Sequence, residues 1–166
     1  MPDFNLEDTA LTNGHNVICG VDEAGRGPWA GPVVAGAVIL ERATLPPELV
    51  DGLDDSKKLK PERRRELLDG LKAHAVIGVG QADVAEIDEM NILQATMLAM
   101  TRAISDLGVD PDLALIDGNK GPKAGCPVKC VVKGDAKSLS IAAASIVAKV
   151  TRDKIMAGLA GIFPGY

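Results

Sequence analysis

Residues 17–40 read V-I-C-G-V-D-E-A-G-R-G-P-W-A-G-P-V-V-A-G-A-V-I-L, and this stretch decides the fold. Two apolar runs, residues 17–21 and 33–40, flank a segment rich in glycine and proline, which predicts a strand, a loop and a second strand. The first strand ends at two adjacent acids, Asp22 and Glu23. Because successive side chains of a strand point to opposite faces, the two carboxylates are expected to converge only if the strand breaks there.

Acids also follow two later predicted strands, at Asp117 and at Asp135. A carboxylate pair at the end of a buried strand loses hydration and repels itself, so it needs protons, basic partners or a metal ion. Mg2+ fits because it takes oxygen ligands and leaves positions open for substrate oxygens. Ligand sites in open α/β sheets gather at strand ends, so Asp22, Glu23, Asp117 and Asp135 are predicted to meet in one cleft. Such a set suits two-metal phosphodiester hydrolysis without a covalent nucleophile.

The remaining pattern predicts an α/β fold, a mixed sheet flanked by helices in a single domain over residues 1–166. Strands joined by a short loop favour antiparallel pairing, and strands separated by helical or long connections favour parallel pairing. Residues 1–16 are expected to form a loose leader, and residues 41–60 a polar connection. Further strands are predicted at 75–82, 113–116 and 128–132. Helices are predicted to start at Pro61, at Asp83 with a capping box, and at Asn91, whose helix ends at Gly108. A last helix is predicted over 138–160.

The bulk composition limits the class of protein. The 166 residues are 46% hydrophobic and 2% aromatic, so one aliphatic core is expected. There is no apolar run of the ~20 residues that a membrane span needs and no secretory signal, so we expect a cytoplasmic monomer with no membrane contact. Three cysteines, Cys19, Cys126 and Cys130, form an odd set without a second C-x-x-C pair, which argues against a disulfide framework and a zinc site.

The net charge of −5 is unusual for a protein that binds nucleic acid, since phosphate contacts normally need a basic surface. Two bound divalent cations would add +4 and leave −1. Residues 120–137 carry five lysines against one acid, which can be read either as a solvated loop surface or as a phosphate-facing one.

Several motifs together resemble bacterial ribonuclease HII. They occur in family order as D-E-A-G-R-G-P (22–28) with W-A-G-P, D-S-K-K-L (55–59), I-D-G-N (116–119), K-G-D-A-K-S (133–138) and I-A-A-A-S-I-V-A-K-V-x-R-D (141–153). The resemblance implies a ribonuclease H-like fold and an endonuclease that uses Mg2+ or Mn2+. Its substrates would be RNA–DNA hybrids and duplex DNA with embedded ribonucleotides, cut to 5'-phosphate and 3'-hydroxyl ends.

The same resemblance assigns residue roles. Asp22, Glu23, Asp117 and Asp135 match the family's metal-binding catalytic carboxylates, and the loop of Gly25, Arg26 and Gly27 matches the one that reads the ribonucleotide. Backbone groups exposed by glycines are suitable partners for a 2'-hydroxyl. Family members continue through a K-G-Y segment and further helices, whose tyrosine has no counterpart here, so we do not expect Tyr166 to take its role.

Two other functions are compatible with parts of the pattern. A nucleotide-binding module could use the glycine-rich turn for phosphate, but there is no G-x-x-x-x-G-K-[ST] motif, and Pro28 and Pro32 remove amide donors. A catalytically weak nucleic-acid-binding fragment is the second alternative. Asp153 lies 18 residues beyond Asp135, about 27 Å along a helix at ~1.5 Å per residue, so it is predicted to be structural.

Overall fold

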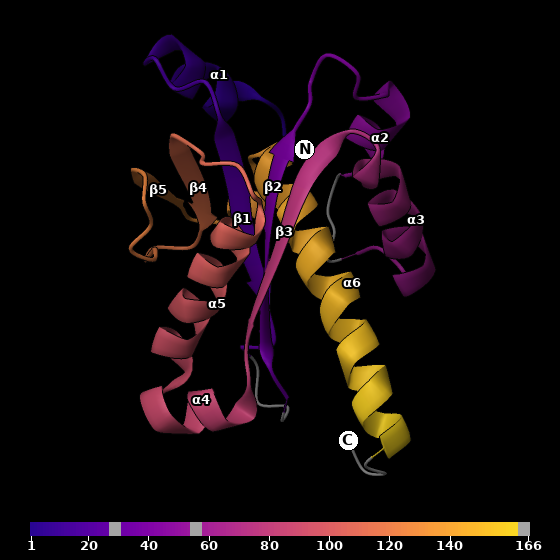
Figure 1. The fold of residues 1–166 in the computed structure, drawn as a ribbon. Coiled ribbons are helices and arrows are strands. Elements are labelled where there is room, and N and C mark those ends of the chain that lie inside the picture. Colours follow the sequence, from indigo (N-terminus) through magenta and orange to yellow (C-terminus); the bar gives the residue numbers. More distant parts are fainter. Residues whose placement is uncertain (27–30, 54–57, 163–166) are drawn as a thin grey trace.

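The structure is a computed structural model that describes residues 1–26, 31–53 and 58–162. Within these ranges one sheet of five strands has the order β3-β2-β1-β4-β5 (Figure 1). Its strands are β1 (Ile18–Ala24), β2 (Val33–Leu40), β3 (Ala75–Ala82), β4 (Leu113–Asp117) and β5 (Val128–Val131). β1 pairs with β2 and β2 with β3 antiparallel, whereas β1 with β4 and β4 with β5 are parallel. The predicted mixed sheet is confirmed.

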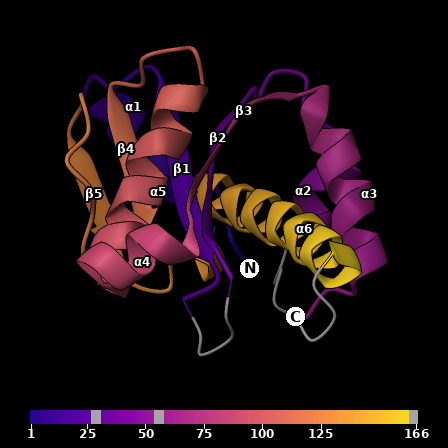
Figure 2. The same ribbon diagram turned by 60° about the horizontal axis from the view of Figure 1, so that its bottom comes forward.

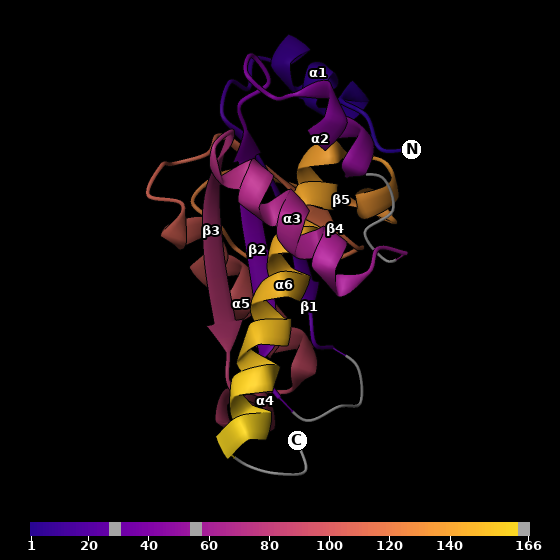
Figure 3. The same ribbon diagram turned by 90° about the vertical axis from the view of Figure 1, so that its right-hand side faces the viewer.

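The helices cover both faces of this sheet. They are α1 (Asn5–Thr12), α2 (Pro47–Gly52), α3 (Pro61–Lys72), α4 (Val84–Met90), α5 (Ile92–Asp106) and α6 (Leu139–Ile162), with a 3-10 turn, η1 (Gly134–Ala136), before α6. Figure 2 shows α5 and α6 on opposite faces, and Figure 3 shows α3 against α6, with α2 next to α3. No described helix has both the length and the apolar character needed to cross a membrane.

The predicted helix starts are confirmed in detail. Pro61 occupies the first turn of α3, where its missing N–H removes no helical bond. Asp83 and Glu86 form a reciprocal capping box at α4. The Asn91 side chain accepts a hydrogen bond from the Gln94 N–H and so caps α5.

The prediction of a loose leader over residues 1–16 is wrong, because α1 forms and docks on the body of the protein. Its Glu7 and Ala10 are buried. The polar connection over residues 41–60 also contains a helix, α2, which starts on a proline. Residues 54–57, part of the D-S-K-K-L motif, lie outside the described ranges.

Glycines let both central helices approach the sheet at backbone distance. A Cβ atom on Gly20 would lie 2.2 Å from the Ser140 carbonyl carbon, and one on Gly36 would lie 2.6 Å from the Ala144 carbonyl oxygen, both in α6. Gly80 makes the matching approach to α5. The core is therefore built of small and aliphatic side chains, as the low aromatic content predicts.

Candidate active site

β1 carries Asp22 and Glu23 without a break. Asp22 pairs with Gly36 and Glu23 with Ala35, and the strand continues to Ala24. The sequence predicted that the two carboxylates would converge only if the strand broke there, and the structure shows no break at either acid. The Asp22 side chain is buried, and its Oδ1 accepts a hydrogen bond of 2.8 Å from the Glu23 N–H.

The register of the sheet places Asp117 beside this pair. Val21 of β1 pairs in parallel with Ile116 of β4, so Asp117 follows at the level of Asp22. Gly20 faces the backbone of α6, and alternation puts Asp22 on that same face. Glu23 instead borders a cavity beside α5. Asp22 and Asp117 are thus neighbours at one end of two parallel strands, and Glu23 adjoins them.

These acids perturb one another. The pKa of Asp22 is raised well above its usual range. Burial is the largest cause of this rise, and the negative charges of Asp117 and Glu23 increase it further. The positive charge of Lys149 opposes this rise. Burial also raises the pKa of Glu23; a hydrogen bond with Asp22 opposes this, and the Asp117 charge adds to it. Glu23 Oε2 is buried without a hydrogen-bond partner. Three acids, Asp22, Glu23 and Asp117, thus share two nearby cations, Lys149 and Arg26.

A backbone hydrogen bond links Asp135 to Asp117. Asp135 lies in η1, and its N–H donates to Asp117 Oδ1 at 3.3 Å, which joins the end of β4 to the turn before α6. In the described part of the chain, no three His, Cys, Asp or Glu side chains are spaced to hold one ion. The structure therefore brings Asp22, Glu23 and Asp117 into electrostatic contact and Asp135 next to them, without a closed cage of four carboxylates.

One cavity opens beside the acids, and a second adjoins it. One, of about 280 Å³, is lined by Glu23, Arg26, Leu93, Met97, Met100, Asp117, Gly118, Asn119 and Lys120. The other, of about 740 Å³, shares Leu93, Met97 and Lys120 with it and extends along α5 to Lys123. Glu23 and Asp117 therefore border a space that is also lined by two cations, Arg26 and Lys120, and by methionine and leucine side chains.

Sequence comparison decides the family. The sequence model of ribonuclease HII matches residues 19–166. A ribonuclease HII from Paramagnetospirillum magneticum is 55% identical over 166 residues, which cover 100% of this chain and 81% of that relative. The chain belongs to the ribonuclease HII family. Its members are ribonuclease H endonucleases, and this chain is one of them.

Solved structures agree with this assignment. Ribonuclease H2 from Pyrococcus horikoshii OT3 superposes with a TM-score of 0.75 at 32% identity, over 90% of this chain and 78% of that one. Bst-RNase HIII in complex with Mn2+ gives a TM-score of 0.77 at 22% identity, over 92% of this chain and 57% of that one. The latter shows the fold alone. The observed sheet and helices are the ribonuclease H-like α/β fold that the sequence predicted.

The G-R-G loop of this ribonuclease HII family member begins with a residue in a left-handed backbone conformation. Gly25 has φ +101, and a Cβ atom there would lie 2.4 Å from Arg152 Nε and 2.6 Å from the Pro32 carbonyl oxygen. Only glycine fits. Arg26 Nη1 lies 3.8 Å from Glu23 Oε1 with the side chain about half exposed, so it stands between the acids and solvent. Gly27, the third predicted residue of the loop, lies outside the described residues.

Two residues next to the site were not singled out from the sequence. Lys149 of α6 donates to Ser145 Oγ and acts on the Asp22 charge. Arg152, one turn later, donates from Nε to the Pro32 carbonyl oxygen at 3.0 Å and packs under Gly25. The available signal was their position in the I-A-A-A-S-I-V-A-K-V-x-R-D motif, where they follow a run of small and aliphatic residues.

Other polar residues have roles outside the acid set. Asp153 Oδ2 lies 3.6 Å from Arg64 Nη1 of α3, which agrees with its predicted structural role. The three cysteines are free. Cys19 is buried, and burial raises the pKa of its thiol to about 12.

Proposed function

We propose that this chain hydrolyses the RNA strand of RNA–DNA hybrids, and cuts at single ribonucleotides in duplex DNA, by two-metal-ion chemistry. The observation that carries the proposal is the group of Asp22, Glu23 and Asp117, three acids that share two nearby cations, Lys149 and Arg26, and in which Glu23 Oε2 is buried without a hydrogen-bond partner. Hard oxygen donors with unbalanced charge suit Mg2+ or Mn2+. Asp135, beside Asp117, completes the proposed ligands.

The absence of a closed cage among the described residues is compatible with this metal class. Mg2+ keeps several waters and often binds through one or two carboxylates together with substrate phosphate oxygens. Metals bound here would lower the pKa of the attacking water and stabilise the leaving oxygen. Glu23 and Asp117 border the cavity into which a scissile phosphate would enter, and Arg26 and Lys120 at its rim would attract it.

Discrimination of RNA from DNA requires contact with the 2'-hydroxyl. We assign this contact to Gly25, Arg26 and Gly27. Supporting the assignment, Gly25 is held by Arg152 and Pro32 at distances that exclude any side chain, so its backbone conformation is fixed at the border of the acid set. We also propose that residues 1–166 act as one catalytic domain, as a monomer and in the cytoplasm.

The test is cleavage of two substrates, an RNA–DNA hybrid and a DNA duplex with one ribonucleotide, with Mg2+, with Mn2+ and with excess chelator. We expect cleavage only with metal, with 5'-phosphate and 3'-hydroxyl ends at the cut. Undiminished cleavage in chelator would overturn the metal mechanism. Tight hybrid binding without any cleavage would instead favour a catalytically weak binding fragment, and micromolar binding of nucleoside triphosphate without hybrid binding would favour a nucleotide-binding module.

A further inference from the structure

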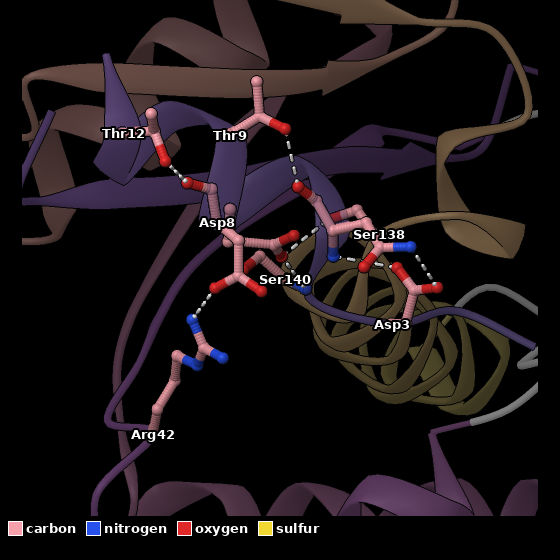
Figure 4. Close-up of polar contacts among 9 residues, drawn as sticks. Asp3, Asp8, Thr9, Thr12, Arg42, Ser138 and Ser140 are labelled. Atoms are coloured by element: carbon pink, nitrogen blue, oxygen red, sulfur yellow. Dashed lines mark hydrogen bonds and ion pairs between the residues drawn. The ribbon is translucent and has the colours of Figure 1, made fainter. Parts of the chain in front are cut away.

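Glu7 is a buried carboxylate that contacts the beginning of α6. It is 4% exposed and lies in α1, more than 130 residues before its partners in sequence. Its Oε2 accepts hydrogen bonds from Ser138 Oγ at 2.9 Å and from the Ser140 N–H at 3.1 Å. Figure 4 shows the labelled Ser138 and Ser140 together with Asp3 and Asp8 of the N-terminal segment. A short N-terminal helix therefore supplies the anion that caps α6.

The N-terminal segment and Ser138 together satisfy the whole first turn of α6. The first four N–H groups of a helix have no partner inside it. Here Ser138 donates to the Gly134 carbonyl oxygen, Leu139 to the Asp3 carbonyl oxygen, Ser140 to Glu7 and Ile141 to Ser138 Oγ. A negative side chain at this end is also favoured by the helix dipole. Asp3 and Glu7 thus satisfy two of these four groups, and the turn of residues 134–138 satisfies the other two.

This capped turn is continuous with Asp135. The Ser138 N–H donates to the Gly134 carbonyl oxygen at 2.8 Å, which closes the turn around Asp135. The Asp135 N–H in turn donates to Asp117 Oδ1. A line of hydrogen-bonded groups therefore runs from Glu7 through Ser138 and the 134–138 turn to two of the proposed metal ligands.

The burial of Glu7 is costly, which indicates that the carboxylate has a role. Its Oε1 is buried without a hydrogen-bond partner. Burying an ionised carboxylate costs far more than burying an apolar side chain unless its partners compensate. Here the compensation comes from Ser138, from Ser140 and from the N-terminal end of α6.

We propose that Glu7 is a positioning residue for the metal site: it fixes the turn of residues 134–138 and so holds Asp135 beside Asp117. This inference rests on the proposed function, in which both acids are metal ligands. Residues that orient metal ligands by hydrogen bonds change metal affinity by about 10–100-fold when they are replaced. Because Glu7 acts through Ser138, we expect an effect near the lower end of that range.

The experiment compares Glu7→Ala with Glu7→Gln and with Arg42→Ala. Glutamine keeps one oxygen that can accept from Ser138 and Ser140, so it should restore most of the function. Arg42 is the matched control, because it holds α1 from its other side, through Asp8 Oδ1 at 2.6 Å and the Phe4 ring, without contact to α6. Two readouts are used on the full chain: hydrogen exchange of the peptide covering residues 131–141 in metal-free protein, and Mn2+ binding by calorimetry.

We expect Glu7→Ala to speed exchange in residues 131–141 and to weaken Mn2+ binding roughly tenfold, with Glu7→Gln and Arg42→Ala close to the starting protein. Ser138→Ala, which removes the group between Glu7 and the turn, should reproduce part of both effects. Unchanged exchange in Glu7→Ala would overturn the inference whatever the metal result. Failure of the unmodified chain to bind Mn2+ would overturn the proposed function instead, since the exchange readout needs no metal. An equal loss of Mn2+ affinity in Arg42→Ala would show that docking of α1 in general, and not Glu7, matters.

Discussion

Replacement of Gly20 by alanine tests whether β1 and α6 contact each other at backbone distance. The new Cβ atom would lie 2.2 Å from the Ser140 carbonyl carbon and 2.4 Å from the Ile141 nitrogen. Favourable contact between carbon atoms needs about 3.5 Å, so roughly 1.3 Å is missing. Both obstacles are backbone atoms, so no side chain can rotate away. Overpacking of a core costs about 1–3 kcal/mol and occasionally more, and we expect about 3 kcal/mol here.

That loss corresponds to a fall in Tm of about 6–12 °C, since a protein of this size loses about 2–4 °C per kcal/mol. Thermal unfolding by circular dichroism measures it. The matched control is Gly158→Ala, because Gly158 is an exposed residue of the same α6 with no neighbouring atom within 4 Å of a new Cβ. Alanine should stabilise the helix there by about 0.5–1 kcal/mol. A Tm for Gly20→Ala within 2 °C of the starting protein would refute the close approach of β1 and α6.

Three further predictions concern the surroundings of the site. Cys19, whose buried thiol has a pKa raised to about 12, should resist iodoacetamide in the native protein, whereas the exposed Cys130 should react; mass spectrometry would contradict this if both were modified at one rate. Asp153→Asn should change the free energy of unfolding by less than about 1 kcal/mol and leave hybrid cleavage intact, because the Asp153 side chain is 54% exposed where it meets Arg64; loss of cleavage would bring Asp153 into the site. In metal-free protein the pKa values of Asp22 and Glu23 are raised above those of the unfolded chain. As pH rises, the unfolded state therefore loses these protons first, and the free energy of unfolding falls above about pH 4. The Tm advantage of Asp22→Asn should therefore grow from pH 4 to pH 7, and a constant difference would contradict the assignment.

Most of the sheet could be predicted from local pattern. Residues 33–40 were expected to form a strand from their apolar run, and β2 occupies the same residues. The caps at Asp83 and Asn91 were also predictable, because capping depends on side chains within three residues of the helix start. At these positions the interactions that form the element lie within a few residues of one another, so the element can be predicted from the sequence.

The errors have a common physical cause, which is dependence on distant partners. α1 was missed because its anchoring side chain is Glu7, a polar residue whose burial depends on Ser138 and Ser140 far along the chain. No strand break at Asp22 is needed for the acids to interact, because Asp117 acts on the charges of both Asp22 and Glu23. Glu23 is one residue from the end of β1, where the end of β4 brings Asp117 alongside both acids.

The candidate acids themselves were predictable as a set, since each follows or ends an apolar strand. Their surroundings were not. Lys149 and Arg152 belong to a motif that was visible in the sequence, but their roles depend on how α6 lies against β1 and against Gly25. The spatial relation of a helix to a loop 120 residues earlier is not encoded in any local spacing.

The most direct test of the central claim is a pair of measurements on Asp22→Asn, the Tm without metal and single-turnover cleavage of a single-ribonucleotide duplex with Mn2+. If the buried acids exist to bind metal, removing one charge relieves repulsion in the metal-free protein while it destroys the site. We predict a Tm equal to or above that of the starting chain, together with cleavage reduced by at least about 100-fold, a loss of about 2.7 kcal/mol of transition-state stabilisation. Cleavage close to that of the unmodified chain, with either Tm result, would contradict the assignment of Asp22 to a catalytic metal site.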